Sequence, residues 1–141
     1  MSKKLLYVVH RYPPFPGGSE NYVRDMAECS VRMGHNVTVL TGQHAGDRNG
    51  VRVVDDPQIL VNEIFDLIIV HGGNVGMQDV VLKNSKYIPS PILFMLILPS
   101  LSESYQTGMR NCKYIGCSTI EDWKFTKQLG YASKSVSVPH S

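Results

Sequence analysis

Apolar runs alternate with amphipathic stretches along the whole chain, and the two patterns predict two kinds of element. Short continuous apolar runs, typical of buried β-strands, occur at residues 5–9, 36–41, 51–54, 67–71, 92–98, 113–117 and 135–138. Apolar residues at helical spacing predict helices over residues 19–33, from 57 to about 64, over 75–83 and from 119 to 130. We therefore expect about seven strands alternating with about five helices.

Local signals refine the ends of these elements. Gly34 is expected to end the first helix as a C-terminal cap. Asp56 before Pro57 predicts the start of the second helix, with the aspartate as N-cap. Ser118, three residues before Glu121, predicts a capping box with Ser118 as N-cap. Residues 99–110 lack a clear period and are expected to be irregular, apart from one helical turn.

The alternation of strands and helices predicts an α/β fold with a doubly wound, mostly parallel sheet, Rossmann-like in kind. The seven apolar residues in a row at 92–98 are typical of a strand buried on both faces. We find no linker or repeat and expect a single domain over residues 1–141. Ligands of such sheets bind at the carboxyl ends of the strands. Loops rich in Gly, Ser, His and Arg fall at that edge, at residues 10–19, 41–50, 71–76, 99–108 and Ser118.

Composition and charge exclude some classes of function. The 141 residues carry a formal net charge of +2 and no long basic run, which argues against a nucleic-acid partner. Cys29, Cys112 and Cys117 have no zinc-site spacing, so we expect reduced cysteines and no metal. No apolar run approaches the ~18 residues of a membrane span. We therefore expect a cytoplasmic protein whose contact with membranes is at most peripheral.

The loop after the first predicted strand carries the strongest chemical signal. Two consecutive glycines, Gly17 and Gly18, stand where the first long helix begins. Glycines leave backbone N–H groups uncovered, and the positive end of a helix dipole favours an anion. The sequence therefore predicts a phosphate-binding loop, with a plain turn before a helix as the alternative reading.

Three pieces of this region together form a recognisable pattern. The chain has Pro13-Pro14 after a strand, Gly17-Gly18-Ser19-Glu20 at the helix start, and Gly34-His35-Asn36-Val37-Thr38-Val39 after the helix. This pattern resembles the N-terminal domain of GT-B glycosyltransferases, specifically glycosyltransferase family 4. The segments 65–72, 115–118 and 134–139 are similar to later parts of that family, so the resemblance covers nearly the whole chain.

The resemblance implies sugar transfer from a nucleotide-sugar donor with retention at the anomeric carbon, without a cofactor or metal. It implies that Gly17, Gly18 and Ser19 bind the donor diphosphate, and Arg11 lies in the same loop as a candidate cation. For the acceptor or sugar cleft, the candidates are Glu20, His10, His71, Gly72, Gly73 and Ser118. For each of these a purely structural role is the alternative.

The chain departs from the family in two respects. Family members continue into a second, donor-binding domain with an E-x7-E motif, and this chain stops at Ser141. Many members also place a histidine after the fifth strand, whereas Leu98-Pro99 stands here, so no catalytic residue is assigned. We therefore expect an acceptor-side domain that is inactive without a donor-binding half.

The expected partners are a nucleotide-sugar, a sugar, lipid-linked or small-molecule acceptor, a separate donor-binding domain and, through exposed apolar surface, a second copy of the chain. The alternative function is a non-catalytic accessory or phosphate-binding module with the same fold. A dinucleotide-dependent protein is less consistent, because the first loop lacks G-x-G-x-x-G.

Overall fold

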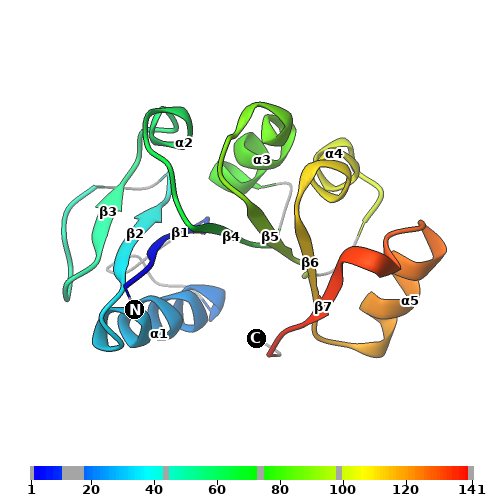
Figure 1. Cartoon of the computed structure of the whole chain (residues 1–141), viewed down its shortest axis with the longest axis horizontal. Helices are drawn as coiled ribbons and strands as arrows, with labels where there is room; N and C mark the ends of the chain where they lie inside the picture. The colour runs from blue at the N-terminus through cyan, green and yellow to red at the C-terminus, as the bar shows by residue number, and fades with distance from the viewer. Residues whose placement is uncertain (1, 11–17, 43–44, 73–74, 98–99, 140–141) are drawn as a thin grey trace.

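The computed structural model describes residues 2–10, 18–42, 45–72, 75–97 and 100–139, and for residues 18–21 the backbone only. In this part of the chain the strands form one seven-stranded sheet in the order β3-β2-β1-β4-β5-β6-β7, and every neighbouring pair is parallel (Figure 1). The strands are β1 (Lys4–Val8), β2 (Asn36–Leu40), β3 (Arg52–Val54), β4 (Leu67–His71), β5 (Ile92–Met95), β6 (Tyr114–Cys117) and β7 (Ser135–Ser137). The Rossmann-like α/β fold class is confirmed.

Helices cover both faces of the sheet. Along one face lies α1 (Gly18–Arg32), whereas α2 (Ile59–Asn62), α3 (Gly76–Lys83) and α4 (Glu103–Asn111) lie on the other (Figure 1). The last helix, α5 (Ile120–Gln128), lies at the β6–β7 end of the sheet. Two 3-10 turns, Ser85–Tyr87 and Ala132–Lys134, precede β5 and β7.

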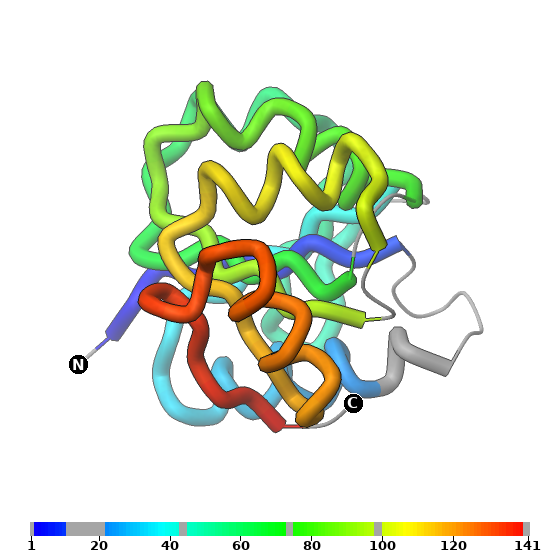
Figure 2. The backbone as a smooth tube through the Cα atoms, turned by 90° about the vertical axis from the view of Figure 1, so that its right-hand side faces the viewer, coloured from blue at the N-terminus to red at the C-terminus, as the bar shows by residue number. Residues whose placement is uncertain are grey.

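The C-terminal segment reaches the start of α1. The Tyr22 hydroxyl donates a hydrogen bond to the Pro139 carbonyl oxygen at 3.3 Å. In Figure 2 the red C-terminal segment runs toward the side of the sheet on which α1 lies. The C-terminal segment is therefore tied to α1.

The core is divided by the sheet, because successive strand residues point to opposite faces. In β1, Leu6 and Val8 belong to the larger apolar cluster, on the side of α2, α3 and α4. Tyr7 and Val9 belong to the smaller cluster, on the side of α1. Central strands buried on both faces explain the continuous apolar runs in the sequence.

The prediction of irregular structure over residues 99–110 is wrong, because α4 occupies most of this segment. Ser102 is its N-cap, and the hydroxyl accepts a hydrogen bond from the Tyr105 amide at 3.4 Å. The buried face has only two large side chains, Tyr105 and Met109, with Ser104 and Gly108 between them. Because two of the four buried positions of α4 are Ser and Gly, the hydrophobic pattern of this segment does not show the helical period.

Three predicted boundaries also need correction. The fifth strand ends at Met95, well before residue 98. The second helix is shorter than predicted and has Gln58 as N-cap, because Asp56 instead accepts a hydrogen bond from the Gln58 amide in the preceding turn. The N-cap of α5 is Thr119 and not Ser118, since the Thr119 hydroxyl accepts from the Asp122 amide at 3.1 Å.

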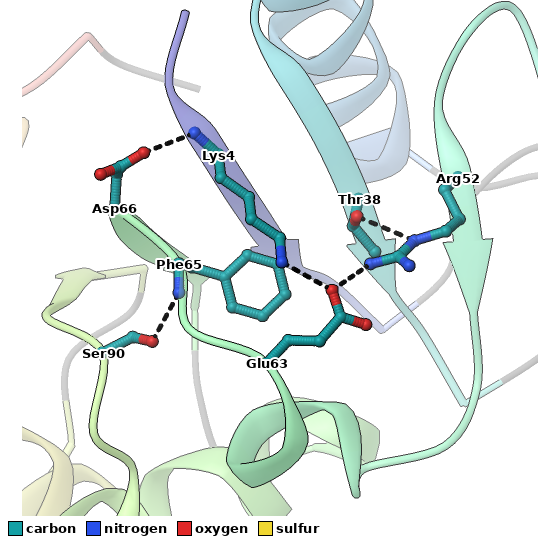
Figure 3. A network of polar contacts seen from close by, with 7 residues as sticks. All are labelled: Lys4, Thr38, Arg52, Glu63, Phe65, Asp66 and Ser90. Carbon is teal, nitrogen blue, oxygen red and sulfur yellow. Dashed lines mark hydrogen bonds and ion pairs between the residues drawn. The ribbon is translucent and has the colours of Figure 1, made fainter.

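A polar network ties the amino ends of the first strands to the segment before β4 (Figure 3). Lys4 Nζ and Arg52 Nη2 both contact Glu63 Oε1, at 2.8 and 2.9 Å. The Arg52 Nε also donates to the Thr38 hydroxyl at 3.1 Å, and the Lys4 amide donates to the Asp66 carboxylate at 2.6 Å. The network lies at the edge of the sheet opposite the predicted site.

Candidate functional site

The predicted site lies where the strand order reverses. From β1 the chain moves to β2 on one side, whereas β4 flanks β1 on the other side. In sheets of this kind the connections that follow the two strands run to opposite faces of the sheet, and ligands bind in the crevice outside the carboxyl ends of these strands. His10 follows β1 and His71 ends β4, so both histidines lie at this edge.

His71 is buried and held from two directions. Its side chain is 3% exposed, and its ring stacks on the ring of Tyr22 from α1 with centroids 5.0 Å apart. The Gln78 side-chain amide, from α3, donates to the His71 carbonyl oxygen at 2.9 Å. Burial lowers the pKa of His71 to about 4, so the imidazole is neutral at pH 7.

His10 is held by the side chain of Thr41 and by close contact with Gly76. Its carbonyl oxygen accepts a hydrogen bond from the Thr41 hydroxyl at 2.9 Å. Its ring lies directly against Gly76, the first residue of α3, where an added Cβ would be 2.5 Å from His10 Nδ1. Gly76 also has a φ of +53°, so both the space and the backbone favour glycine there.

Three buried polar atoms meet no partner among the residues that the structure describes: His10 Nδ1, His71 Nε2 and Gln78 Oε1. All three belong to residues at the carboxyl edge of β1 and β4 or to the helix that follows β4. A buried polar atom without a hydrogen bond is unfavourable by about 1–3 kcal/mol, so such atoms are rare in folded proteins. Their concentration at one edge indicates a place where a ligand or ordered water completes the hydrogen bonds.

The structure describes only part of the predicted diphosphate loop. Arg11 and Gly17 lie outside the described residues, as does Gly73 of the cleft. Gly18 is the first residue of α1, and Ser19 and Glu20 are in its first turn, where the backbone alone is described. Their assigned roles stay predictions.

The remaining candidates have clear positions. Gly72 follows β4 with a φ of +81°, and its amide donates to the Met95 carbonyl at 2.9 Å. Ser118 follows β6, two strands away from β4, so it does not lie beside His71 in the sheet order. Its amide and hydroxyl both donate to Asp122 Oδ2, at 3.0 and 3.3 Å, so its polar groups serve the start of α5.

Two residues of the site were missed by the sequence reading. Tyr22 supplies the ring that stacks on His71, and Gln78 supplies the buried amide. Gln78 could have been suspected, because it stands on the same helical face as Met77, Val81 and Leu82, which are all buried. A polar residue on the apolar face of a helix is a signal for a buried polar contact.

Neither a metal cluster nor a membrane span is found in the described residues. They contain no group of three or more His, Cys, Asp or Glu side chains placed to hold a metal ion. No helix in this part of the chain combines the length and apolar character needed to cross a bilayer.

Comparison with known proteins identifies a solved structure that shares the fold. No known family profile matches the sequence, and no curated protein matches it. Among solved structures, the catalytic domain of starch synthase IV from Arabidopsis thaliana, bound to ADP and acarbose, matches with a TM-score of 0.66 and 10% identity. The match covers 99% of this chain and 52% of the starch synthase chain, so this chain spans about half the length of that structure. At this identity the match shows a shared fold, that of a GT-B glycosyltransferase domain.

Proposed function

We propose that this chain is the acceptor-side domain of a retaining glycosyltransferase that uses a nucleotide-sugar donor, similar to glycosyltransferase family 4. The observation that carries the proposal is the carboxyl edge of β1 and β4, where the buried ring of His71 stacks on Tyr22 near the start of α1 in a GT-B-like fold. The bound ADP and acarbose of the starch synthase structure are consistent with a nucleotide and a sugar as ligands.

The diphosphate would bind at the start of α1. The amides of Gly17, Gly18 and Ser19 would donate to the leaving diphosphate, and the Arg11 guanidinium would neutralise part of its charge. Donors placed where charge develops stabilise the transition state, and one such donor contributes roughly 3 kcal/mol. The stack between Tyr22 and His71 supports this arrangement, because it brings α1 against the end of β4.

The acceptor or the transferring sugar would occupy the crevice itself, near His10, His71 and Gly72. The neutral state of His71 suits an uncharged ligand group at this position. A second, donor-binding domain, in the same or in another chain, would complete the binding site for the nucleotide-sugar. Without that domain we expect binding but no transfer.

The proposal is tested by titrating the ¹⁵N-labelled chain with ADP and, in parallel, with adenosine. We expect ADP at millimolar concentration to shift the amides of Gly18 and Ser19, because the diphosphate binds the helix N-terminus. Adenosine lacks the diphosphate and should leave these amides unchanged. No shift with ADP, or the same shift with both compounds, would contradict the proposal.

A matched pair of arginine variants tests whether the Arg11 guanidinium contributes to diphosphate binding. Arg11→Gln should weaken ADP binding about tenfold, which is the size expected for a lost charge-assisted hydrogen bond. Arg24→Gln is the control, since Arg24 on α1 pairs with Asp25 at 3.0 Å. Equal affinity in the two variants would remove Arg11 from the site.

A further inference from the structure

We propose that the groove between α2 and α3 is the contact surface of a two-fold symmetric dimer of this chain. The two helices lie beside each other on the same face of the sheet (Figure 1). The groove has a volume of about 250 Å³ and is lined from residues 57–61 on one side and from residues 80–88 on the other. The inference goes beyond the proposed function and does not depend on it, because the groove contains none of the residues proposed to bind the nucleotide-sugar.

Apolar side chains of the groove are left in contact with water. Val61 is 51% exposed, Val80 is 37% exposed and Tyr87 is 71% exposed. Leu60 and Ile88 line the same groove and are buried. A cluster of exposed apolar side chains is typical of a surface that a partner covers, and tyrosine is enriched in protein–protein interfaces. The groove therefore has an apolar centre whose burial would favour association.

The charged residues beside the groove have opposite signs at its two ends. Asp55 and Asp56 follow β3 at the carboxyl edge of the sheet and directly precede the lining residue Pro57. Lys86 lies in the turn between α3 and β5, near the amino edge, and directly precedes the lining residue Tyr87. In a parallel sheet each connecting helix runs back from the carboxyl edge to the amino edge, so these charges lie at opposite ends. All three charged side chains are exposed.

This charge pattern is complementary to a second copy of itself. Among the residues that the structure describes, Asp79 pairs with Lys83, and no ion pair includes Asp55 or Lys86. A two-fold axis in the plane of the contact, perpendicular to the line from Asp55 to Lys86, places the acidic end of one copy on the basic end of its partner, twice per dimer. An axis parallel to that line would bring like charges together, which opposes association. The charges therefore select both the partner and its orientation.

Sedimentation velocity of the full chain at rising concentration tests the dimer. We expect monomers at low micromolar concentration and a growing dimer fraction as the concentration approaches the millimolar range. A chain that stays monomeric up to millimolar concentration would overturn the inference. The same result would leave the proposed function standing, because ADP binding at the start of α1 does not require a dimer.

Two charge-reversed chains test the orientation of the dimer. Lys86→Glu makes the basic end acidic, and a chain with both Asp55→Lys and Asp56→Lys has a basic end in place of the acidic one. Each variant alone should dimerise about tenfold more weakly than the wild type, because both contacts become repulsive. An equal mixture of the two should form a heterodimer, since both contacts then join opposite charges. A mixture that stays monomeric would contradict the inference.

Matched controls separate this face from the rest of the surface. Lys124→Glu makes the same charge change on the exposed side of α5 and should dimerise like the wild type. Tyr87→Ser should weaken the dimer, whereas Met33→Ser, at a residue 69% exposed after α1, should not. A control as harmful as its groove counterpart would place the contact elsewhere and refute the inference. If the doubly reversed chain does not fold, the comparison of Lys86→Glu with Lys124→Glu decides.

Discussion

A histidine ring at the end of β4 is kept neutral by burial, and this has a consequence for stability. His71 binds its proton with a pKa of about 4 in the folded state, against 6.5 for an exposed histidine. Between these two values the unfolded chain binds more protons than the folded chain does. His71 therefore destabilises the fold as the pH falls through this window, and its contribution is constant above pH 6.5.

We expect the unfolding free energy to fall by about 3 kcal/mol from this group between pH 6.5 and pH 4, since each pKa unit corresponds to about 1.4 kcal/mol. Urea unfolding at a series of pH values measures the slope. The variant His71→Gln cannot titrate and should show a flatter dependence across the same window. Identical slopes in the two proteins would show that His71 is accessible to protons in the folded state.

At the level of residues, the sequence predicted where some of the candidate residues lie. His10 and His71 could be named because they directly follow apolar strand runs, and strand ends of a parallel sheet meet at one edge. The burial of Gln78 could be suspected from its place on the apolar face of α3, but its partner, the His71 carbonyl, is set by how α3 packs against the sheet. The glycine at position 76 is explained only by the structure, where His10 Nδ1 occupies the space of a side chain.

At the level of elements, two neighbouring hydroxyl residues, Ser118 and Thr119, contribute differently to the start of α5. Thr119→Ala removes the acceptor for the Asp122 amide, so we expect a loss of about 1 kcal/mol in unfolding free energy. Ser118→Ala should cost less, because the Ser118 amide still donates to Asp122. Urea unfolding of both variants checks the order, and the reverse order would restore Ser118 as the N-cap.

The network in Figure 3 offers a second element-scale prediction. Hydrogen bonds from Arg52 and then from Lys4 lower the pKa of Glu63, so its contribution to stability is present above its ordinary pKa and is lost in acid. Because the charges are partly exposed, Glu63→Gln should lower the unfolding free energy by at most about 1 kcal/mol. The difference should shrink in 1 M salt, where screening is strong.

The control for this network is Asp79→Asn, which breaks the pair between Asp79 and Lys83 on one face of α3. Such a pair within a helix contributes only about 0.2–0.5 kcal/mol. Thermal unfolding at low and high salt compares the two variants. If Asp79→Asn lowers the stability more than Glu63→Gln does, the two ion pairs that Glu63 forms with Lys4 and Arg52 contribute no more than separate weak surface pairs.

Element boundaries show why local patterns predict some helices better than others. The first helix was predicted within one residue at each end, because Gly34 ends it with a φ of +91° and apolar positions recur along it. The helix α4 was missed, because Gly108 and Ser104 fill its packed face. Gly108 allows α4 to pack closely on Leu82 of α3. This contact joins two helices, so it cannot be read from the sequence of α4 alone.

At the scale of the whole molecule, the alternation of strands and helices predicted the parallel sheet but not which strands are neighbours. The order follows from pairings across long stretches of chain, such as β1 with β4. This order places β4 in the interior and leaves β3 and β7 at the two edges. The most buried part of the sheet and the candidate site therefore share one strand.

Hydrogen exchange should reveal this arrangement. We expect the amides of β4 to exchange slowest, because β4 has a strand on each side and its residues Ile68 and Val70 are fully buried. The amides of β7 should exchange fastest among the strands, because β7 has three residues, pairs only with β6 and is partly exposed. Exchange followed by NMR in low urea measures both, at two protein concentrations. If β7 is as protected as β4 and its protection rises with concentration, a second copy pairs with this edge, as unpaired edge strands allow.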